Sequence, residues 1–119
     1  MATKEVAQGL TGLCKSGQFD EAMTRYYAPD IVSVEAFGNP AETRGIAATQ
    51  EKSQWFMDNH EVHGAEVEGP YINGDQFVVR FKIDLTEKAT GKRAVVDEVG
   101  VYTVKNDKIV HERFFPVTV

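Results

Sequence analysis

The chain has 119 residues, 42% of them hydrophobic, which is enough for one compact domain and too little for two. Thirteen Lys and Arg residues against eighteen Asp and Glu residues give a net charge of −5, which argues against binding to nucleic acid or anionic membranes. The single cysteine, Cys14, cannot form an internal disulfide. No run approaches the roughly 20 apolar residues of a transmembrane helix, and the N-terminus does not resemble a signal peptide. We therefore expect one domain over residues 1–119 in the reducing cytoplasm.

Apolar residues recur at helical spacing in two N-terminal stretches, 6–14 and 19–27. Gly17 can close the first of these helices. Pro29 prevents the second from continuing past Tyr27. A third helix, the longest, is expected between Gly45 and His60, where no helix breaker occurs.

The remaining segments favour strands. The segment 31–37 is rich in β-branched and aromatic residues and is followed by the loop sequence Gly38-Asn39-Pro40. After residue 61 the helical period disappears, and four further strands are expected at 62–68, 77–86, 93–104 and 109–115. Gly69-Pro70 should end the first of these four, and Asn73-Gly74-Asp75 is a strong turn sequence before the second. Apolar residues on both parities of 93–104 predict a central strand covered on both faces.

This order of elements predicts an α+β domain. Three N-terminal helices should pack on one face of a mainly antiparallel sheet, because each element must bury its apolar stripe. Long antiparallel sheets twist strongly, so the concave face should enclose an apolar pocket beneath the helices. Such a pocket is the default site for a small hydrophobic molecule.

Three sequence features resemble those of a known family. These are Tyr27-Ala28-Pro29-Asp30 leading into a strand, Gly45 before the third helix, and the closing segment 101–112. Together with the element order they resemble the SnoaL-like, ketosteroid isomerase-related branch of the nuclear transport factor two-like superfamily. The resemblance implies a cone-shaped α+β barrel and a homodimer formed through the sheet. The superfamily includes isomerases, polyketide cyclases and ligand carriers, so the fold does not select one activity.

The ketosteroid isomerases of this superfamily use an Asp base and an oxyanion hole made of a Tyr and a protonated Asp. By resemblance, Glu35 takes the position of the base and Asp97 that of the protonated acid. Leu10 replaces the oxyanion tyrosine, which removes one donor. Tyr27 matches a supporting tyrosine, and Ser53 replaces a supporting aromatic residue.

The residues themselves leave the positions of these two acids open. Asp97 lies among valines, so if buried it should be protonated or paired. Because strand side chains alternate, Asp97 and Glu98 cannot face the same side, and the alternative is that Asp97 points outward and Glu98 or neither lies inside. Glu35 shares its parity with Ile31 and Ser33, which permits an inward carboxylate, although a rim position in water is equally compatible.

Other candidate pocket residues come from the third helix and the last strand. The resemblance implies that Glu112 and Phe114 face the pocket, although a cross-strand ion pair would also explain Glu112. Trp55 and Phe56 should pack in the core or close the mouth of the pocket. The three histidines lack the spacing of a zinc site, so no metal is expected.

The sequence therefore predicts isomerase-like or cyclase-like chemistry on a small, hydrophobic keto or enol compound. Glu35 or Asp97 would move a proton next to a carbonyl group, without metal or organic cofactor. The alternative is a non-catalytic ligand-binding or dimerisation module of the same fold, and the leucine at position 10 favours it.

Overall fold

The computed structural model of the chain describes residues 2–38 and 41–117. Within these ranges the chain forms three helices and six strands, and every helix predicted from the sequence is present. Their bounds are α1 (Ala2–Lys15), α2 (Phe19–Tyr26), β1 (Tyr27–Val34), β2 (Glu42–Arg44), α3 (Ile46–Asn59), β3 (His60–Asn73), β4 (Gln76–Glu87), β5 (Arg93–Lys105) and β6 (Lys108–Pro116). None of the helices in these ranges is both long and apolar enough to cross a membrane.

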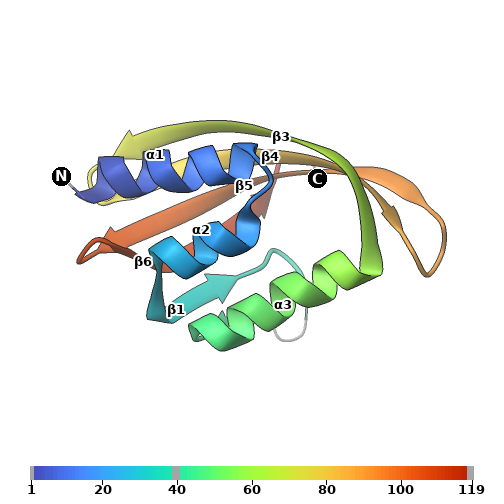
Figure 1. Cartoon of the computed structure of the whole chain (residues 1–119), viewed down its shortest axis with the longest axis horizontal. Helices are drawn as coiled ribbons and strands as arrows, with labels where there is room; N and C mark the ends of the chain where they lie inside the picture. Colours follow the sequence, from blue (N-terminus) through green and yellow to red (C-terminus); the bar gives the residue numbers. More distant parts are fainter. Residues whose placement is uncertain (1, 39–40, 118–119) are drawn as a thin grey trace.

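The strands form one mixed sheet in the order β2-β1-β6-β5-β4-β3. Only the pair β1 and β6 is parallel, and the other neighbours are antiparallel. The sheet is strongly curved, and β3 bends after α3 before running beside α1 (Figure 1). Register shifts in the β3–β4 pair add to this curvature, since bulges increase local twist. The sheet does not close, because β2 and β3 remain edges, so the α+β cone is confirmed and full barrel closure is not.

The core lies between the concave face of the sheet and the helices. Alternate residues of β4, including Phe77, Val79 and Phe81, are buried against Leu10 of α1 and Ile31 of β1. Burial of each side chain of this size contributes about 1.5–3 kcal/mol to folding before the entropy of ordering is counted. This shared core fixes the helices over the concave face and determines which side chains face inward.

Local backbone chemistry sets the ends of the helices. Gly17 adopts a φ of +76°, and the N–H of Gln18 donates to the carbonyl of Leu13, which ends α1. The second helix ends one residue earlier than predicted, because Tyr27 takes an extended conformation and begins β1. Gly45, at a φ of +90°, precedes α3.

The first strand was predicted at 31–37, whereas β1 begins four residues earlier and ends three residues earlier, at Tyr27–Val34. Three further details of the strands differ from the sequence-based expectations. The strand β3 continues through Gly69-Pro70, where it was predicted to end. Proline is tolerated there because β3 is an edge strand and the register shifts between Glu68 and Tyr71. The strand β2 was not predicted, since three residues carry no recognisable alternation. The outer face of β5 is also not covered within one chain, and Val95 there is 64% exposed.

Candidate functional site

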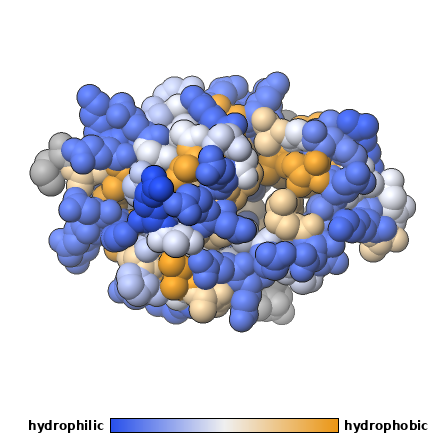
Figure 2. Space-filling model, viewed as in Figure 1, coloured by the Kyte–Doolittle hydropathy of each residue, from blue (hydrophilic) through white to orange (hydrophobic). Residues whose placement is uncertain are grey.

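A cavity of about 650 Å³ lies between the helices and the concave face of the sheet. This volume is in the range of small-molecule sites in proteins. Figure 2 shows a hollow beside α3 that is bordered by hydrophobic side chains. Most of the lining is apolar, and its polar or titratable members are Cys14, Tyr27, Glu35, Thr49, Lys52, Ser53, Trp55, Glu98, Tyr102 and Glu112.

Glu112 of β6 is the most deeply buried carboxyl group of the cavity. Its side chain is 2% exposed and accepts hydrogen bonds from two residues of β1. The Tyr27 hydroxyl donates to Oε1, and the Ser33 hydroxyl donates to Oε2 over 2.6 Å. Burial raises the pKa of Glu112, and the two hydrogen bonds and the nearby Lys52 charge oppose that rise. Both carboxylate oxygens are therefore held in place by the parallel β1–β6 pairing.

Lys52 of α3 joins this network to a second acid. Its Nζ lies 3.0 Å from Oε1 of Glu35 and donates to Oγ of Ser33 over 2.6 Å. Glu35 follows directly after β1, so its carboxyl group lies beside α3. The resulting chain of contacts runs from Glu35 through Lys52 and Ser33 to Glu112. Lys52 is the only ammonium or guanidinium group among the cavity-lining residues that the structure describes.

Glu98 of β5 contributes a third carboxyl group to the cavity. Burial raises the pKa of Glu98 to about 7, and the neighbouring Glu35 and Glu112 charges add to the rise. No described residue donates a hydrogen bond to its carboxyl group, unlike Glu112. Glu98 is thus a partly buried acid that can gain or lose a proton near neutral pH. Its carboxyl group can contact a molecule bound in the cavity.

Tyr102, four residues after Glu98 on the same face of β5, places a phenol in the cavity wall. Its ring is stacked on Phe77 with a centroid separation of 4.8 Å and lies over Gly100. A Cβ at Gly100 would come within 2.8 Å of the Tyr102 ring, so this position requires glycine for the ring to remain there. The structure gives the Tyr102 hydroxyl no hydrogen-bond partner among the described residues. A bound oxygen atom can therefore accept a hydrogen bond from this hydroxyl.

The prediction that Asp97 faces the pocket is wrong. Asp97 pairs with Lys82 across the β4–β5 ladder, while Glu98 pairs with the inward Phe81. Arg80 binds both carboxylate oxygens of Asp97, at 3.0 and 2.9 Å, on the outer face of the sheet. That guanidinium holds the pKa of Asp97 below its usual value. The outward arrangement left open by the sequence is the one observed.

The other residues predicted to form the site line the cavity. Glu35 lies there with Lys52, and Leu10 is buried in the wall, where it offers no hydrogen-bond donor. The remaining members are Tyr27, Ser53, Trp55, Phe56, Glu112 and Phe114. The alternative of a cross-strand ion pair does not hold for Glu112, because its partners are hydroxyl groups in the interior.

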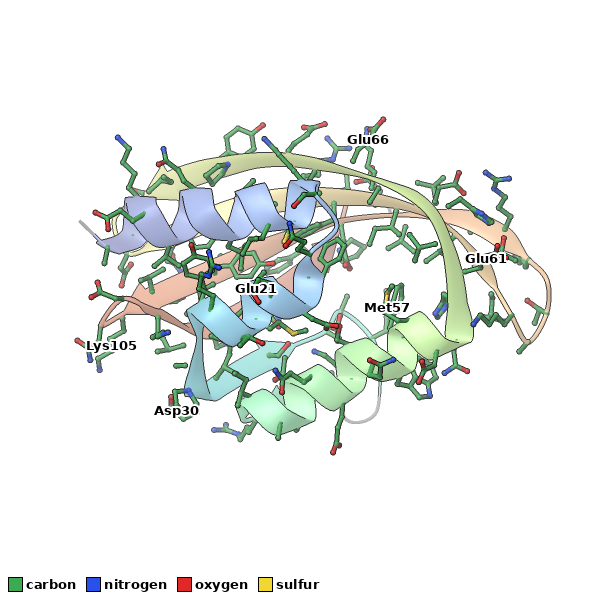
Figure 3. All side chains as sticks on the ribbon, in the orientation of Figure 1. Glu21, Asp30, Met57, Glu61, Glu66 and Lys105 are labelled. Carbon is green, nitrogen blue, oxygen red and sulfur yellow. The ribbon has the colours of Figure 1, made fainter. Side chains whose placement is uncertain are left out.

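The mouth of the cavity is bordered by exposed apolar side chains. Phe37, Trp55 and Met57 all line the cavity, yet they are 79%, 63% and 46% exposed. In Figure 3 the side chain of Met57 points from α3 toward the sheet. These residues give the opening an apolar rim, which suits entry of a hydrophobic molecule.

Three further residues complete the polar wall: Glu98, which the sequence left as the alternative to Asp97, and Lys52 and Tyr102, which were not predicted as site residues. The alternation in β5 could have identified two of them, because Glu98 and Tyr102 share a parity with the buried Val104. The position of α3 over the end of β1 brings the Lys52 ammonium group to Glu35, and no local sequence pattern indicates this contact.

Cys14 and the arrangement of possible metal ligands were also considered as parts of the site. Burial raises the pKa of the Cys14 thiol to about 12, so Cys14 is not a thiolate nucleophile at neutral pH. In the described ranges, no group of three or more His, Cys, Asp or Glu side chains is arranged to hold a metal ion. Among the cavity carboxyls, Glu98 has the pKa nearest neutral pH, about 7.

Comparison with known proteins identifies the family of the chain. A profile of the SnoaL-like domain matches residues 1–116. A protein of Mesorhizobium loti, provisionally named a SnoaL-like polyketide cyclase, is 54% identical, with a TM-score of 0.93 over 97% of this chain and 99% of that chain. No curated protein matches the chain.

More distant structures share the fold alone. A second provisional SnoaL-like polyketide cyclase, from Jannaschia sp. CCS1, is 16% identical, with a TM-score of 0.75 over 98% of this chain and 85% of that one. TerC, crystallised with polyporic acid, is 16% identical, with a TM-score of 0.73 over 99% of this chain and 93% of that one. The profile match over almost the whole chain and the 54% identical structure lead to one conclusion: this protein belongs to the SnoaL-like family.

Proposed function

We propose that the cavity catalyses isomerase-like or cyclase-like proton transfer on a small, hydrophobic keto or enol compound. The observation that carries this proposal is Glu98, a carboxyl group in the cavity wall that has no protein partner among the described residues and a pKa of about 7. A base with this pKa is partly ionised at neutral pH and can also return a proton as an acid. The family of the chain and the provisional cyclase name of its 54% identical relative support this class of activity.

The proposed step is reversible enolisation. The Glu98 carboxylate removes a proton from the carbon next to a carbonyl group, and the C–H electron pair forms the enolate. Protonated Glu98 then returns the proton to carbon, at the same or a conjugated position. Glu35 was the sequence-based candidate for this base, but its carboxylate is already paired with Lys52 at 3.0 Å, so we assign the transfer to Glu98.

The developing oxyanion needs a hydrogen-bond donor. By the resemblance to the isomerases, Leu10 stands where they carry a donor, and its apolar side chain in the cavity wall cannot donate. We assign this role to the Tyr102 hydroxyl, which lies in the same wall as Glu98 and has no hydrogen-bond partner among the described residues. Loss of one such donor typically lowers the rate about 10²–10³-fold. Tyr102→Phe should therefore reduce the rate by that factor while leaving ligand affinity within a few fold.

The experiment that tests the proposal is deuterium exchange at the α carbon of 2-tetralone, a hydrophobic and enolisable ketone, in D2O. The wild-type protein should accelerate the exchange above the buffer rate, because its cavity supplies a base next to a bound ketone. Glu98→Gln should abolish the acceleration. The matched control is Asp97→Asn, which removes the neighbouring carboxylate from the opposite face and should retain it.

The Glu98→Gln variant decides whether Glu98 is the base. If Glu98→Gln still accelerated the exchange, another residue would be the base. Glu35→Gln would then test Glu35 in that role. Binding of 2-tetralone without any acceleration would favour the second candidate function, a non-catalytic ligand-binding module. The buried Leu10, in place of a donor, is the observation that favours this second candidate.

A further inference from the structure

Lys52 carries a positive charge into a cavity wall that holds three carboxyl groups, and two neighbours fix its position. Its Nζ lies 3.0 Å from Oε1 of Glu35 and donates to Oγ of Ser33 over 2.6 Å. A lysine side chain is flexible when it has no partners, so these two contacts determine where the charge lies. The ammonium group is thereby held between α3 and the end of β1.

The contact with Ser33 connects Lys52 to a third residue. The side chain of Ser33 is 0% exposed, and its hydroxyl donates to Oε2 of Glu112 over 2.6 Å. A hydroxyl group has one proton and two lone pairs, and Lys52 occupies one of the lone pairs. The single proton of Ser33 is therefore directed toward Glu112. Lys52 thus pairs with one acid of the cavity and orients the hydrogen bond to a second.

Glu98, the third acid, depends on the charges around it, because no described residue donates a hydrogen bond to its carboxyl group. Burial and the charges of Glu35 and Glu112 raise the pKa of Glu98 to about 7, whereas the Lys52 charge lowers it. The apolar wall separates these groups from bulk water, so the charges act on one another with little screening. The protonation of Glu98 consequently responds to the Lys52 charge.

Other titratable groups around Glu98 do not alter this balance near neutral pH. The pKa of Cys14 on α1 is raised by burial, and those of Tyr27 on β1 and Tyr102 on β5 are raised well above 10, so all three stay neutral. The cavity linings described for α2, β3 and β4 contain no titratable side chain.

We propose that Lys52 is a positioning residue of this site, whose fixed charge balances Glu35 and Glu112 so that Glu98 exchanges its proton near neutral pH. The inference rests on the proposed function, since it describes what sets the pH range of the proposed base. In this role Lys52 transfers no proton itself and acts through Glu98. Without the ammonium charge, three carboxyl groups would share one apolar wall, and Glu98 would release its proton only at higher pH.

A carboxyl ¹³C NMR titration of Glu98 in charge variants tests this role. Lys52→Met removes the cation and should raise the midpoint of the Glu98 titration by about one pH unit, the low end of the effect of one nearby opposite charge. Glu35→Gln removes a carboxylate and should lower the midpoint. The double variant removes both charges of the pair and should return the midpoint close to the wild-type value.

Three further variants separate charge from structure. Lys52→Arg keeps the charge and should keep the wild-type midpoint. Lys52→Gln keeps a hydrogen-bond donor without the charge and should behave as Lys52→Met, which it replaces if the methionine variant does not fold. Lys105→Met is the matched control, because it removes an exposed lysine at the end of β5, away from the cavity (Figure 3), and should leave the midpoint unchanged.

The pH profile of the 2-tetralone exchange gives a second measurement. At about pH 7, Lys52→Met should exchange about fivefold more slowly than the wild type, because a smaller fraction of Glu98 is ionised. The rate should recover at about pH 9, where Glu98 is ionised in both proteins. A purely structural role for Lys52 would lower the rate at every pH.

The two measurements distinguish failure of this inference from failure of the proposed function. An unchanged Glu98 midpoint in both Lys52→Met and Lys52→Gln would overturn the inference, and acceleration of the exchange by the wild type would still support the proposed catalysis. Absence of acceleration by the wild type would refute the catalysis. The NMR midpoints would then still decide whether the Lys52 charge controls the protonation of Glu98.

Discussion

Glu98 and Asp97 are neighbours in the sequence but lie in opposite electrostatic environments. Asp97 meets the Arg80 guanidinium on the outer face, which lowers its pKa. Glu98 faces an apolar cavity with two other acids, which raises its pKa to about 7. The alternation of a single strand thus separates an ordinary ion pair from a group able to transfer protons.

The raised pKa of Glu98 predicts how stability depends on pH. The native state keeps a proton that the unfolded chain releases above about pH 4.5, the ordinary value for glutamate. The free energy of unfolding should therefore fall as pH rises from about 4.5 to about 7, by up to about 3 kcal/mol, and level off above. Urea denaturation at a series of pH values measures this decrease.

Glu98→Gln isolates the contribution of this one group. The variant has no proton to lose, so its unfolding free energy should gain on that of the wild type as pH rises from about 4.5 to about 7, and the difference should stay constant above. A difference that stays constant with pH would show that Glu98 titrates normally.

The hydrogen bond from Tyr27 to Glu112 also has a testable effect on stability. Tyr27→Phe removes one of the two donors to a carboxyl group that is 2% exposed. Leaving that oxygen without its partner should cost about 1–3 kcal/mol. Thermal and urea denaturation measure the loss. Tyr71→Phe is the control, since Tyr71 is 60% exposed and should change stability by less than about 0.5 kcal/mol.

At the scale of elements, the long alternating strands and the three helices could be predicted because their apolar periods are clear. The strand β4 is the simplest case, since its alternate residues Phe77, Val79 and Phe81 are all buried. Continuation of β3 through Pro70 could not be predicted, because it depends on β3 being an edge. The short strand β2 depends on pairing with β1 and has no pattern of its own.

The site was predictable to the extent that strand parity determines it. Glu35, Tyr27 and Glu112 line the cavity as expected from their parity or from the family resemblance. Asp97 was misplaced because the resemblance outweighed the alternation that puts Glu98 beside Tyr102 and Val104 on the inner face. The contact between Lys52 and Glu35 is tertiary, since it depends on where α3 lies against the sheet.

Two glycines of α1 give a prediction for helix packing. A Cβ at Gly9 would lie 1.9 Å from the Tyr26 hydroxyl oxygen, whereas nothing lies within 4 Å of a Cβ at Gly12. Gly9→Ala should therefore displace Tyr26 and loosen the contact between α1 and α2, with a loss of about 1–3 kcal/mol. Gly12→Ala should stabilise the protein by about 0.4–1 kcal/mol, because alanine favours the helix.

Denaturation of the two alanine variants side by side measures this contrast. Equal stabilisation by both would show that Tyr26 does not pack on Gly9. Both variants keep the cavity-lining residues unchanged, so their ligand binding should match the wild type.

At the scale of the whole molecule, the outer face of the sheet combines ion pairs with exposed apolar residues. The ion pairs on this face are Arg80–Asp97 and Arg93–Asp84. The exposed apolar residues near them are Tyr71, Val95 and Phe115, at 60%, 64% and 42% exposure. A curved sheet whose inner face is covered by helices leaves this outer face available to a second copy. The homodimer expected from the sequence remains our prediction.

Sedimentation equilibrium tests that prediction. The wild-type chain should sediment as a dimer, and Phe115→Glu should shift the population toward the monomer by placing like charges at a self-facing surface. The control is Tyr26→Phe, on the helical side, which should leave the association unchanged. A wild-type protein that sediments as a monomer at all accessible concentrations would refute the dimer.

The most direct test of the account is a carboxyl ¹³C NMR titration that compares Glu98 with Asp97. We predict a pKa of about 7 for Glu98 and one below the ordinary value of 3.8 for Asp97. This result would place a proton-transferring carboxyl group in the cavity and an ion pair on the opposite face. Titration of Glu98 near its ordinary value of 4.5, as for a solvated glutamate, would contradict the proposed proton transfer.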